Sequence, residues 1–192
     1  MRVLVACEFS GRVRNAFLAK GHDAWSCDLV PGTLEPHDRH IRGDVTELLK
    51  QQWDLVIAHP PCTYLCLSGV RWLYTEEGRL GKMWLAKQFF KLCLEANAPK
   101  VCVENPIMHG RAKYKLPPCS QKIQPWQFGD NESKTTLLWL KGLPPLKRTH
   151  EKPTVINQTI HRKLFKLPRK YRGYLRSLTY HGIANAMAEQ WG

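Results

Sequence analysis

Long hydrophobic runs are missing from this sequence of 192 residues, because no stretch of about eighteen apolar residues occurs in it. The chain opens on MRVLVACEF, which is typical of a first strand and lacks the charged, apolar and small-residue segments of a secretory signal. These absences exclude a membrane-spanning helix. We expect a soluble, cytoplasmic protein of one domain, with no membrane partner.

The seven cysteines form an odd set in a chain too large to need disulfide bonds for its stability. The spacing of His59, Cys62 and Cys66 matches no standard zinc pattern, so we expect no metal. Most of the cysteines sit in apolar segments, where a free thiol packs as a small hydrophobe, and we expect them to be reduced. The three-glycine pyrophosphate fingerprint is missing too, which weighs against a dinucleotide cofactor.

Acidic residues are scarce towards the C-terminal end. From Lys141 to Arg176 there are eleven Lys and Arg against the single acid Glu151, so 11 minus 1 puts +10 of the formal net charge of +13 in this stretch. Aromatic residues lie in or beside it, namely Phe165, Tyr171, Tyr174 and Tyr180. Cations for phosphates and flat rings for bases together predict a nucleic-acid partner. A solvated basic face is the alternative.

Short apolar runs alternate with segments of helical periodicity along the chain. Strands are predicted at 3–9, 23–29, 53–58, 100–105 and 135–140, and helices at 13–22, 75–97 and 183–191. Strands that alternate with helices imply a mainly parallel, twisted sheet with helices on both faces. The sequence therefore predicts a Rossmann-like α/β fold.

Ligands of open parallel sheets bind outside the carboxyl ends of the strands, so polar residues just past those ends are candidates for a site. They are Glu8 to Gly11, Asp28, Asp44, His59 to Cys62, Glu104 and Asn105. A glycine turn after the first strand and an acid after the second are typical of a site for an adenosine group. A surface acid or a helix cap is the alternative for Asp28.

The segment HPPC holds the thiol of Cys62 in a set direction, because each proline fixes its own backbone angle and restricts its predecessor. Such a thiol becomes a nucleophile where positive surroundings stabilise its thiolate. The segment VENP ends another strand with Glu104, again just before a proline. A packing cysteine and a solvated acid are the alternatives for these two residues.

These motifs, in this order, resemble those of the DNA cytosine-5 methyltransferases, and specifically of their compact phage or prophage-type members. The resemblance covers nearly the whole chain. Its segments are EFSG for the first motif, GDV, PPCTYLCLSG for the nucleophile loop, ENP, FGDNESKTTLLWLKG, and GIANAMA for the final motif.

The resemblance implies S-adenosyl-L-methionine as the cofactor and DNA as the partner. It gives catalytic roles to Cys62, as the nucleophile, and to Glu104, which holds the ring nitrogen of a flipped cytosine. The residues assigned to the cofactor are Glu8, Phe9, Ser10, Gly11, Asp28, Leu29, Asp44, Val45, His59, Pro60 and Asn185. The residues assigned to the substrate and DNA are Pro61, Asn105, Lys134, Arg162, Lys163, Arg169, Lys170 and Arg172.

The implied fold is the Rossmann-like fold of S-adenosylmethionine-dependent methyltransferases, formed by residues 1–192 as one catalytic domain. The implied reaction is methyl transfer to C5 of cytosine through a Cys62 adduct, in the cytoplasm of a bacterial host cell if the protein is phage-encoded. A short basic insert at about residues 144–179 takes the position of a full target recognition domain, which predicts relaxed sequence specificity.

Three departures from the family pattern accompany the resemblance. Arg12, Val13 and Arg14 stand where the family has later glycines, Thr63 replaces a glutamine, and Lys134 stands in for paired arginines.

Two other functions remain open. One is an amino-methyltransferase acting on adenine N6 or cytosine N4, which also uses two prolines at this strand end. The other is a catalytically degenerate, DNA-binding relative.

Overall fold

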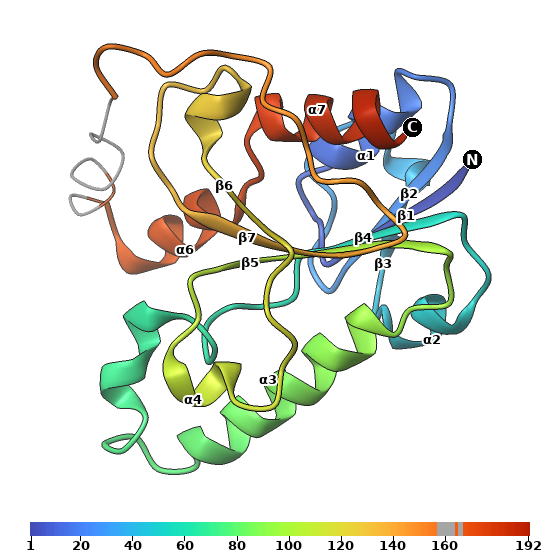
Figure 1. The fold of residues 1–192 in the computed structure, drawn as a ribbon. Coiled ribbons are helices and arrows are strands. Elements are labelled where there is room, and N and C mark those ends of the chain that lie inside the picture. Colours follow the sequence, from blue (N-terminus) through green and yellow to red (C-terminus); the bar gives the residue numbers. More distant parts are fainter. Residues whose placement is uncertain (157–163, 165–166) are drawn as a thin grey trace.

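Seven strands form one sheet in the computed structural model, which describes residues 1–156, 164 and 167–192 (Figure 1). The strands are β1 (Arg2–Ala6), β2 (Asp23–Asp28), β3 (His40–Arg42), β4 (Leu55–Ala58), β5 (Lys100–Pro106), β6 (Gln121–Ile123) and β7 (Thr136–Lys141). The α-helices are α1 (Arg12–Leu18), α2 (Thr46–Lys50), α3 (Arg79–Leu94), α4 (Gly110–Lys113), α6 (Arg169–Ser177) and α7 (His181–Trp191). Three 3₁₀ turns complete the set: η1 (His37–Arg39), η2 (Leu67–Trp72) and η3 (Pro125–Phe128).

The strand order is β3-β2-β1-β4-β5-β7-β6. Strands β1 to β5 run parallel to one another, and β7 pairs antiparallel with both β5 and β6. The order reverses between β1 and β4, since the chain winds first towards β3 and then back towards β5. A crevice at such a switch point, outside the carboxyl ends of the strands, is where ligands of doubly wound sheets bind.

Helices cover both faces of the sheet, as Figure 1 shows with α1 and α7 above it and α2 and α3 below. Alternate residues of β1 pack on opposite faces of the sheet. Val3 and Val5 belong to the cluster that α1 and α7 complete, whereas Leu4 and Ala6 belong to the cluster completed by α2 and α3. The strands are therefore apolar on both faces, which explains their nearly continuous hydrophobic runs.

The predicted Rossmann-like α/β fold is confirmed, with a strand or helix in each of the segments where the sequence predicts one. The sequence missed β3, β6, α2 and α4, which are three to five residues long and too short to show a period. It also missed α6, a helix of nine residues within the segment that was predicted only as a basic insert. One helix start was wrong. The acids Glu76 and Glu77 precede α3, because Gly78 takes a left-handed conformation with φ 69° and the helix begins at Arg79. Within the described ranges, no helix is long and apolar enough to cross a membrane.

Candidate active site

His59 and Glu104 form a buried pair at the carboxyl ends of two neighbouring strands. The register pairs Ala58 of β4 with Val103 of β5, so the next residue of each strand reaches the same edge. The Nδ1 atom of His59 lies 2.7 Å from Oε2 of Glu104, and the two side chains are only 10% and 17% exposed. The sequence assigned His59 to the cofactor, whereas the structure gives it Glu104 as its partner.

The pKa of His59 is raised and the pKa of Glu104 is lowered, each relative to its usual value. Burial alone would lower the pKa of His59, but the hydrogen bond and the charge of Glu104, with a smaller contribution from Glu8, raise it above its usual value. Burial would raise the pKa of Glu104, but His59 and then Lys134 lower it. The pair is therefore held as an imidazolium and a carboxylate, with the amine of Lys134 close enough to act on both charges.

The loop that carries Cys62 is tied to β5 and to α3. At its start, the buried side chain of Asn105 donates a hydrogen bond from Nδ2 to the carbonyl oxygen of Pro60, at 3.0 Å. At its other end, Gly69 packs so closely that a Cβ there would lie 2.6 Å from the carbonyl oxygen of Thr63. Arg79 donates to that same oxygen at 3.3 Å. Pro61 lies exposed between these anchors.

Cys62 lies in the same turn as a second thiol, Cys66, which the sequence indicated only as a candidate metal ligand. The backbone N–H groups of Leu65 and Cys66 both donate to the carbonyl oxygen of Cys62, at 2.9 Å each, and this turn brings the two thiols together. Their hydrogen bond raises the pKa of Cys62 and lowers that of Cys66. Ser68 strengthens the effect, with its Oγ 3.0 Å from Sγ of Cys66. The directions of the two shifts favour the thiol on Cys62 and the thiolate on Cys66.

The charges of Glu104 and Lys134 at the strand ends also act on the pKa of Cys62. After the bond to Cys66 and burial, the charge of Glu104 raises the pKa of Cys62 further, and the charge of Lys134 lowers it. The structure thus brings Cys62, Glu104, His59 and Lys134 into one electrostatic neighbourhood.

The turn after β1 is organised by Glu8, which is 3% exposed. Its Oε1 accepts from the N–H of Val13 at 2.7 Å and from Ser10 Oγ at 3.1 Å, and its Oε2 accepts from the N–H of Arg14 at 3.2 Å. The first N–H groups of α1 are therefore satisfied by the protein's own carboxylate, where phosphate-binding folds hold a phosphate. The side chains of Glu8 and Ser10 are engaged within this turn, and their contact with a cofactor stays a prediction.

Arg14, in the first turn of α1, fills the space beside the turn after β1. Its side chain is fully buried, donates to the carbonyl oxygen of Leu34 at 2.7 Å and lies 3.2 Å from Ser26 Oγ. Gly11, at φ 71°, packs on it so closely that a Cβ would lie 2.6 Å from Nη2 of Arg14. A side chain other than hydrogen at Gly11 would disturb both the turn and this contact.

Asp28 and Asp44 lie together at the ends of β2 and β3. The N–H of Gly43 donates to the carbonyl oxygen of Asp28 at 2.9 Å, and after burial the charges of both acids help to raise the pKa of the Cys27 thiol to about 11. One oxygen of each carboxylate holds a turn, Asp28 through Val30 N at 3.1 Å and Asp44 through Thr46 N at 2.9 Å.

Four other residues assigned to the cofactor have different surroundings. Leu29 is 71% exposed beside Asp28, whereas Val45 is buried. Pro60 is buried, and its carbonyl oxygen accepts the bond from Asn105. Asn185 lies on the exposed side of α7.

The basic segment packs against the first motif through α6. The ring of Tyr174 lies 5.1 Å from the ring of Phe9, centroid to centroid. Arg12 Nη1 donates to the carbonyl oxygen of Thr179, and Lys134 Nζ to that of Arg176, at 2.8 Å each.

The basic residues assigned to DNA are described only in part. The Nε of Arg172 donates to the carbonyl oxygen of Leu167 at 2.7 Å. Arg162 and Lys163 lie outside the described residues. Arg169 and Lys170 belong to the first turn of α6, and their side chains are not among those described.

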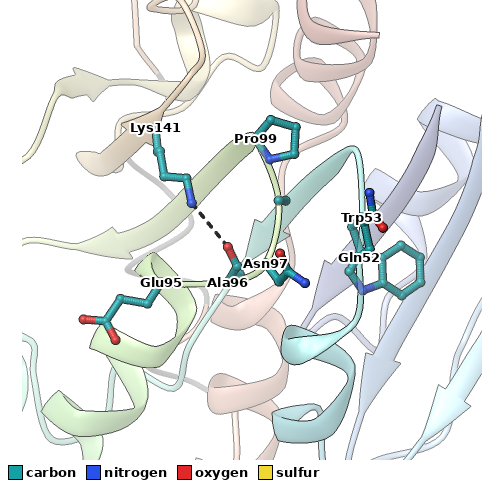
Figure 2. A pocket seen from close by; sticks show the side chains of 8 residues that line it. Gln52, Trp53, Glu95, Ala96, Asn97, Pro99 and Lys141 are labelled. Atoms are coloured by element: carbon teal, nitrogen blue, oxygen red, sulfur yellow. Dashed lines mark hydrogen bonds between the residues drawn. The ribbon is translucent and has the colours of Figure 1, made fainter.

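A hollow lies elsewhere, at the amino ends of β4 and β5 (Figure 2). It measures about 600 Å³ and is lined by Gln52, Trp53, Glu95, Ala96, Asn97, Ala98, Pro99 and Lys141. None of the predicted site residues lines it, and the bond from Lys141 to the carbonyl oxygen of Ala96 spans part of it, at 3.3 Å. It stands at the edge of the sheet opposite to Cys62. Over the described part of the chain, no group of three or more His, Cys, Asp or Glu is arranged to hold a metal ion.

Comparison with known proteins finds similar structures but no similar sequence family. No protein-family model matches the chain, and no curated protein sequence does. A solved protein described as a DNA modification methyltransferase, encoded within a prophage of E. coli, is similar over 87% of this chain and 55% of its own, with 16% identity and a TM-score of 0.49. The 16S rRNA methylase RmtB is similar over 72% and 54%, with 20% identity and a TM-score of 0.38. An rRNA methylase from Escherichia coli gives 72% and 55%, with 20% identity and a TM-score of 0.40.

The chain spans about half the length of each of these neighbours. At this level of likeness they say nothing of the activity of this chain. The fold therefore rests on the strand order and pairing of the chain itself, and any function has to be argued from its own side chains.

Proposed function

We propose that this protein transfers a methyl group from S-adenosyl-L-methionine to C5 of cytosine in DNA, through a covalent adduct on Cys62. One observation carries the proposal. A thiol on a loop anchored by Asn105 lies in the electrostatic neighbourhood of Glu104, a carboxylate already paired with a proton donor. The motifs that resemble those of DNA cytosine-5 methyltransferases fall on these same residues.

The residues around the switch point fit a cofactor that has an adenosine group and no phosphate. The carboxylate of Glu8 already neutralises the start of α1, so an anionic ligand gains nothing there. Asp28 and Asp44 would hold the ribose and the adenine amino group, and the exposed side chain of Leu29 would cover the adenine ring. When bound, S-adenosylmethionine would supply the methyl group as an electrophile.

The chain's own residues would make the cytosine reactive. Cys62 loses its thiol proton to water and attacks C6 of the base as the thiolate, so that one S–C bond forms. Glu104 binds the N3 edge, and the proton of the His59 imidazolium passes through the carboxylate to N3 as negative charge develops there. After methylation, the C5 proton leaves to water, the S–C bond breaks, and both protons return.

Covalent trapping tests the proposal. Wild-type protein, incubated with S-adenosylmethionine and DNA that contains 5-fluorocytosine, should give an adduct that survives denaturation, because a fluorine at C5 cannot leave as a proton. Cys62→Ser should give none while binding cofactor normally, and Cys119→Ser, which alters a half-buried thiol outside the site, should behave as wild type.

Methylated product without an adduct would refute the covalent mechanism and favour an amino-methyltransferase. Absence of cofactor binding in calorimetry would favour a degenerate DNA-binding relative.

A further inference from the structure

Exposed aromatic side chains gather beside the nucleophile loop, on η2, the turn before α3, α3 itself and α4. Tyr74, Trp84 and Tyr114 are 64%, 58% and 67% exposed, and Trp72 is 39% exposed. A cluster of exposed rings on one surface is typical of a binding site for another molecule. We call this surface the aromatic face and define it by Arg71, Trp72, Tyr74, Trp84, Arg111 and Tyr114.

Contacts between distant segments make the aromatic face continuous. The N–H of Leu67 donates to the carbonyl oxygen of Ile107 at 3.1 Å, which sets η2 beside the start of the α4 segment. The guanidinium of Arg111 lies 5.0 Å from the centre of the Tyr74 ring.

On the α3 side, Lys87 donates to the carbonyl oxygen of Tyr114 at 2.6 Å and lies 5.9 Å from its ring. Trp84 sits three residues before Lys87 and shares its side of α3.

Cations are interleaved with the rings of this face. Arg71 lies over the ring of Trp72 at 4.5 Å, and Lys115 lies 5.5 Å from the ring of Tyr114. From residue 107 to residue 122 there are four Lys and Arg and no acid. Cations beside flat rings match a partner that offers anionic groups next to flat groups, which is the chemistry of a nucleic-acid strand.

The position of the face connects it with the proposed chemistry. An isolated bridge pairs Cys66 with Met108, so the face begins directly beyond the thiol pair. In Figure 1, α4 lies below the level of the sheet, and α6 lies at the left end of the sheet, at about the height of β7. A strand crossing the carboxyl ends of β4 and β5 would meet α6 and the aromatic face at different points along its length.

We propose that the aromatic face binds an unpaired DNA strand, with bases stacked on Trp72, Tyr74 and Tyr114 and phosphates on Arg71 and Arg111. An unpaired strand fits better than a duplex because paired bases are stacked on one another and offer no face to a protein ring. The choice of DNA rests on the proposed function. The choice of a single strand rests on the rings alone.

The experiment is fluorescence anisotropy of a labelled mixed-sequence DNA strand of about a dozen nucleotides, without cofactor, against full-length protein. Alanine at Trp72, Tyr74 or Tyr114 should each weaken binding by about 5- to 100-fold, the range for loss of one base–ring stack. Tyr74→Phe and Tyr114→Phe keep the ring and should bind within about twofold of wild type.

Charge is tested separately. Arg111→Ala should weaken binding and lower the slope of log Kd against log salt by about 0.7, as expected for one phosphate contact on a single strand. Lys141→Ala removes the same charge at the opposite edge of the sheet and should change neither quantity. The ring variants should keep the wild-type slope.

Four results would overturn the proposal: wild-type binding by the alanine variants, equal affinity for duplex and single strand, a preference for RNA of the same sequence, or a wild-type dimer that the alanine variants dissociate. Repeating the measurement with Cys62→Ser separates the two proposals. A Cys62→Ser variant that binds the strand but no longer methylates it supports the proposed chemistry, whereas the aromatic face is judged on the ring variants. Loss of binding in the ring variants supports the aromatic face, whatever the outcome for Cys62→Ser.

Discussion

The pair of His59 and Glu104 should give the protein a pH window of extra stability, which Glu104→Gln would remove. The two side chains are 10% and 17% exposed, so solvent screens their interaction little. Breaking such a pair by removing one partner costs about 3–5 kcal/mol, because the other charge stays buried without compensation. In a protein of this size about 3 kcal/mol corresponds to roughly 10 °C in melting temperature.

The sign of the pH dependence follows from the two pKa shifts. The pKa of His59 is raised, so its contribution is complete below about pH 6.5, its unfolded value, and is lost as pH rises through the folded value. The pKa of Glu104 is lowered, so its contribution is complete above about pH 4.3 and is lost as pH falls through the folded value. The difference between wild type and Glu104→Gln should therefore be largest between about pH 4.3 and 6.5.

Thermal unfolding from pH 4 to pH 9 measures this difference directly. Above the raised pKa of His59, a neutral imidazole and the amide that replaces the Glu104 carboxylate would exchange an ordinary hydrogen bond, and the difference should shrink to about 1 kcal/mol. Glu95→Gln removes an exposed carboxylate at the opposite edge and should show no window. A difference for Glu104→Gln that stays constant across this pH range would refute the buried ion pair.

Three further outcomes are expected. Cys66→Ala should lower the pKa of Cys62, because the hydrogen bond to Cys66 is the largest cause of its rise, so adduct formation with 5-fluorocytosine DNA should keep its rate down to a lower pH than in the wild type; an unchanged rate–pH profile would contradict the coupling of the two thiols. Asp28→Ala should weaken S-adenosylmethionine binding in calorimetry by about 10-fold or more, whereas an equal affinity would leave Asp28 as a turn residue only. Methylation should have relaxed sequence preference with DNA affinity that falls steeply with salt, and sequencing that finds a strict site of four or more bases would argue against this.

The edge of the sheet that holds the site could be predicted from the sequence, because the carboxyl ends of parallel strands converge. Cys62, Glu104 and Asp28 come directly after or at the end of apolar runs, and the structure sets them at that edge. The partner of Glu104 could not be predicted. Pairing it with His59 requires knowing that β4 and β5 are neighbours in this register, which is a property of the assembled sheet.

Other features depended on local geometry that no pattern displays. The backbone turn after Cys62, which brings Cys66 back to it, follows two prolines that hide any helical period. Glu8 has the position of a cofactor ligand, yet it caps α1 because the turn at Gly11 points the N–H groups of Val13 and Arg14 at it. The aromatic face joins segments that are about thirty residues apart, so its rings appear in the sequence as scattered surface residues.

The helices that cover one face of the sheet are made at different times during synthesis. Val3 and Val5 of β1 are made before α7, and they belong to a cluster that contains Ile183, Met187 and Trp191 of that helix. A growing chain therefore has this apolar face of its central strand covered by α1 alone until α7 is made. The paired strands β1, β2 and β4 are complete before that, so part of this face stays exposed while the residues between β4 and α7 are synthesised.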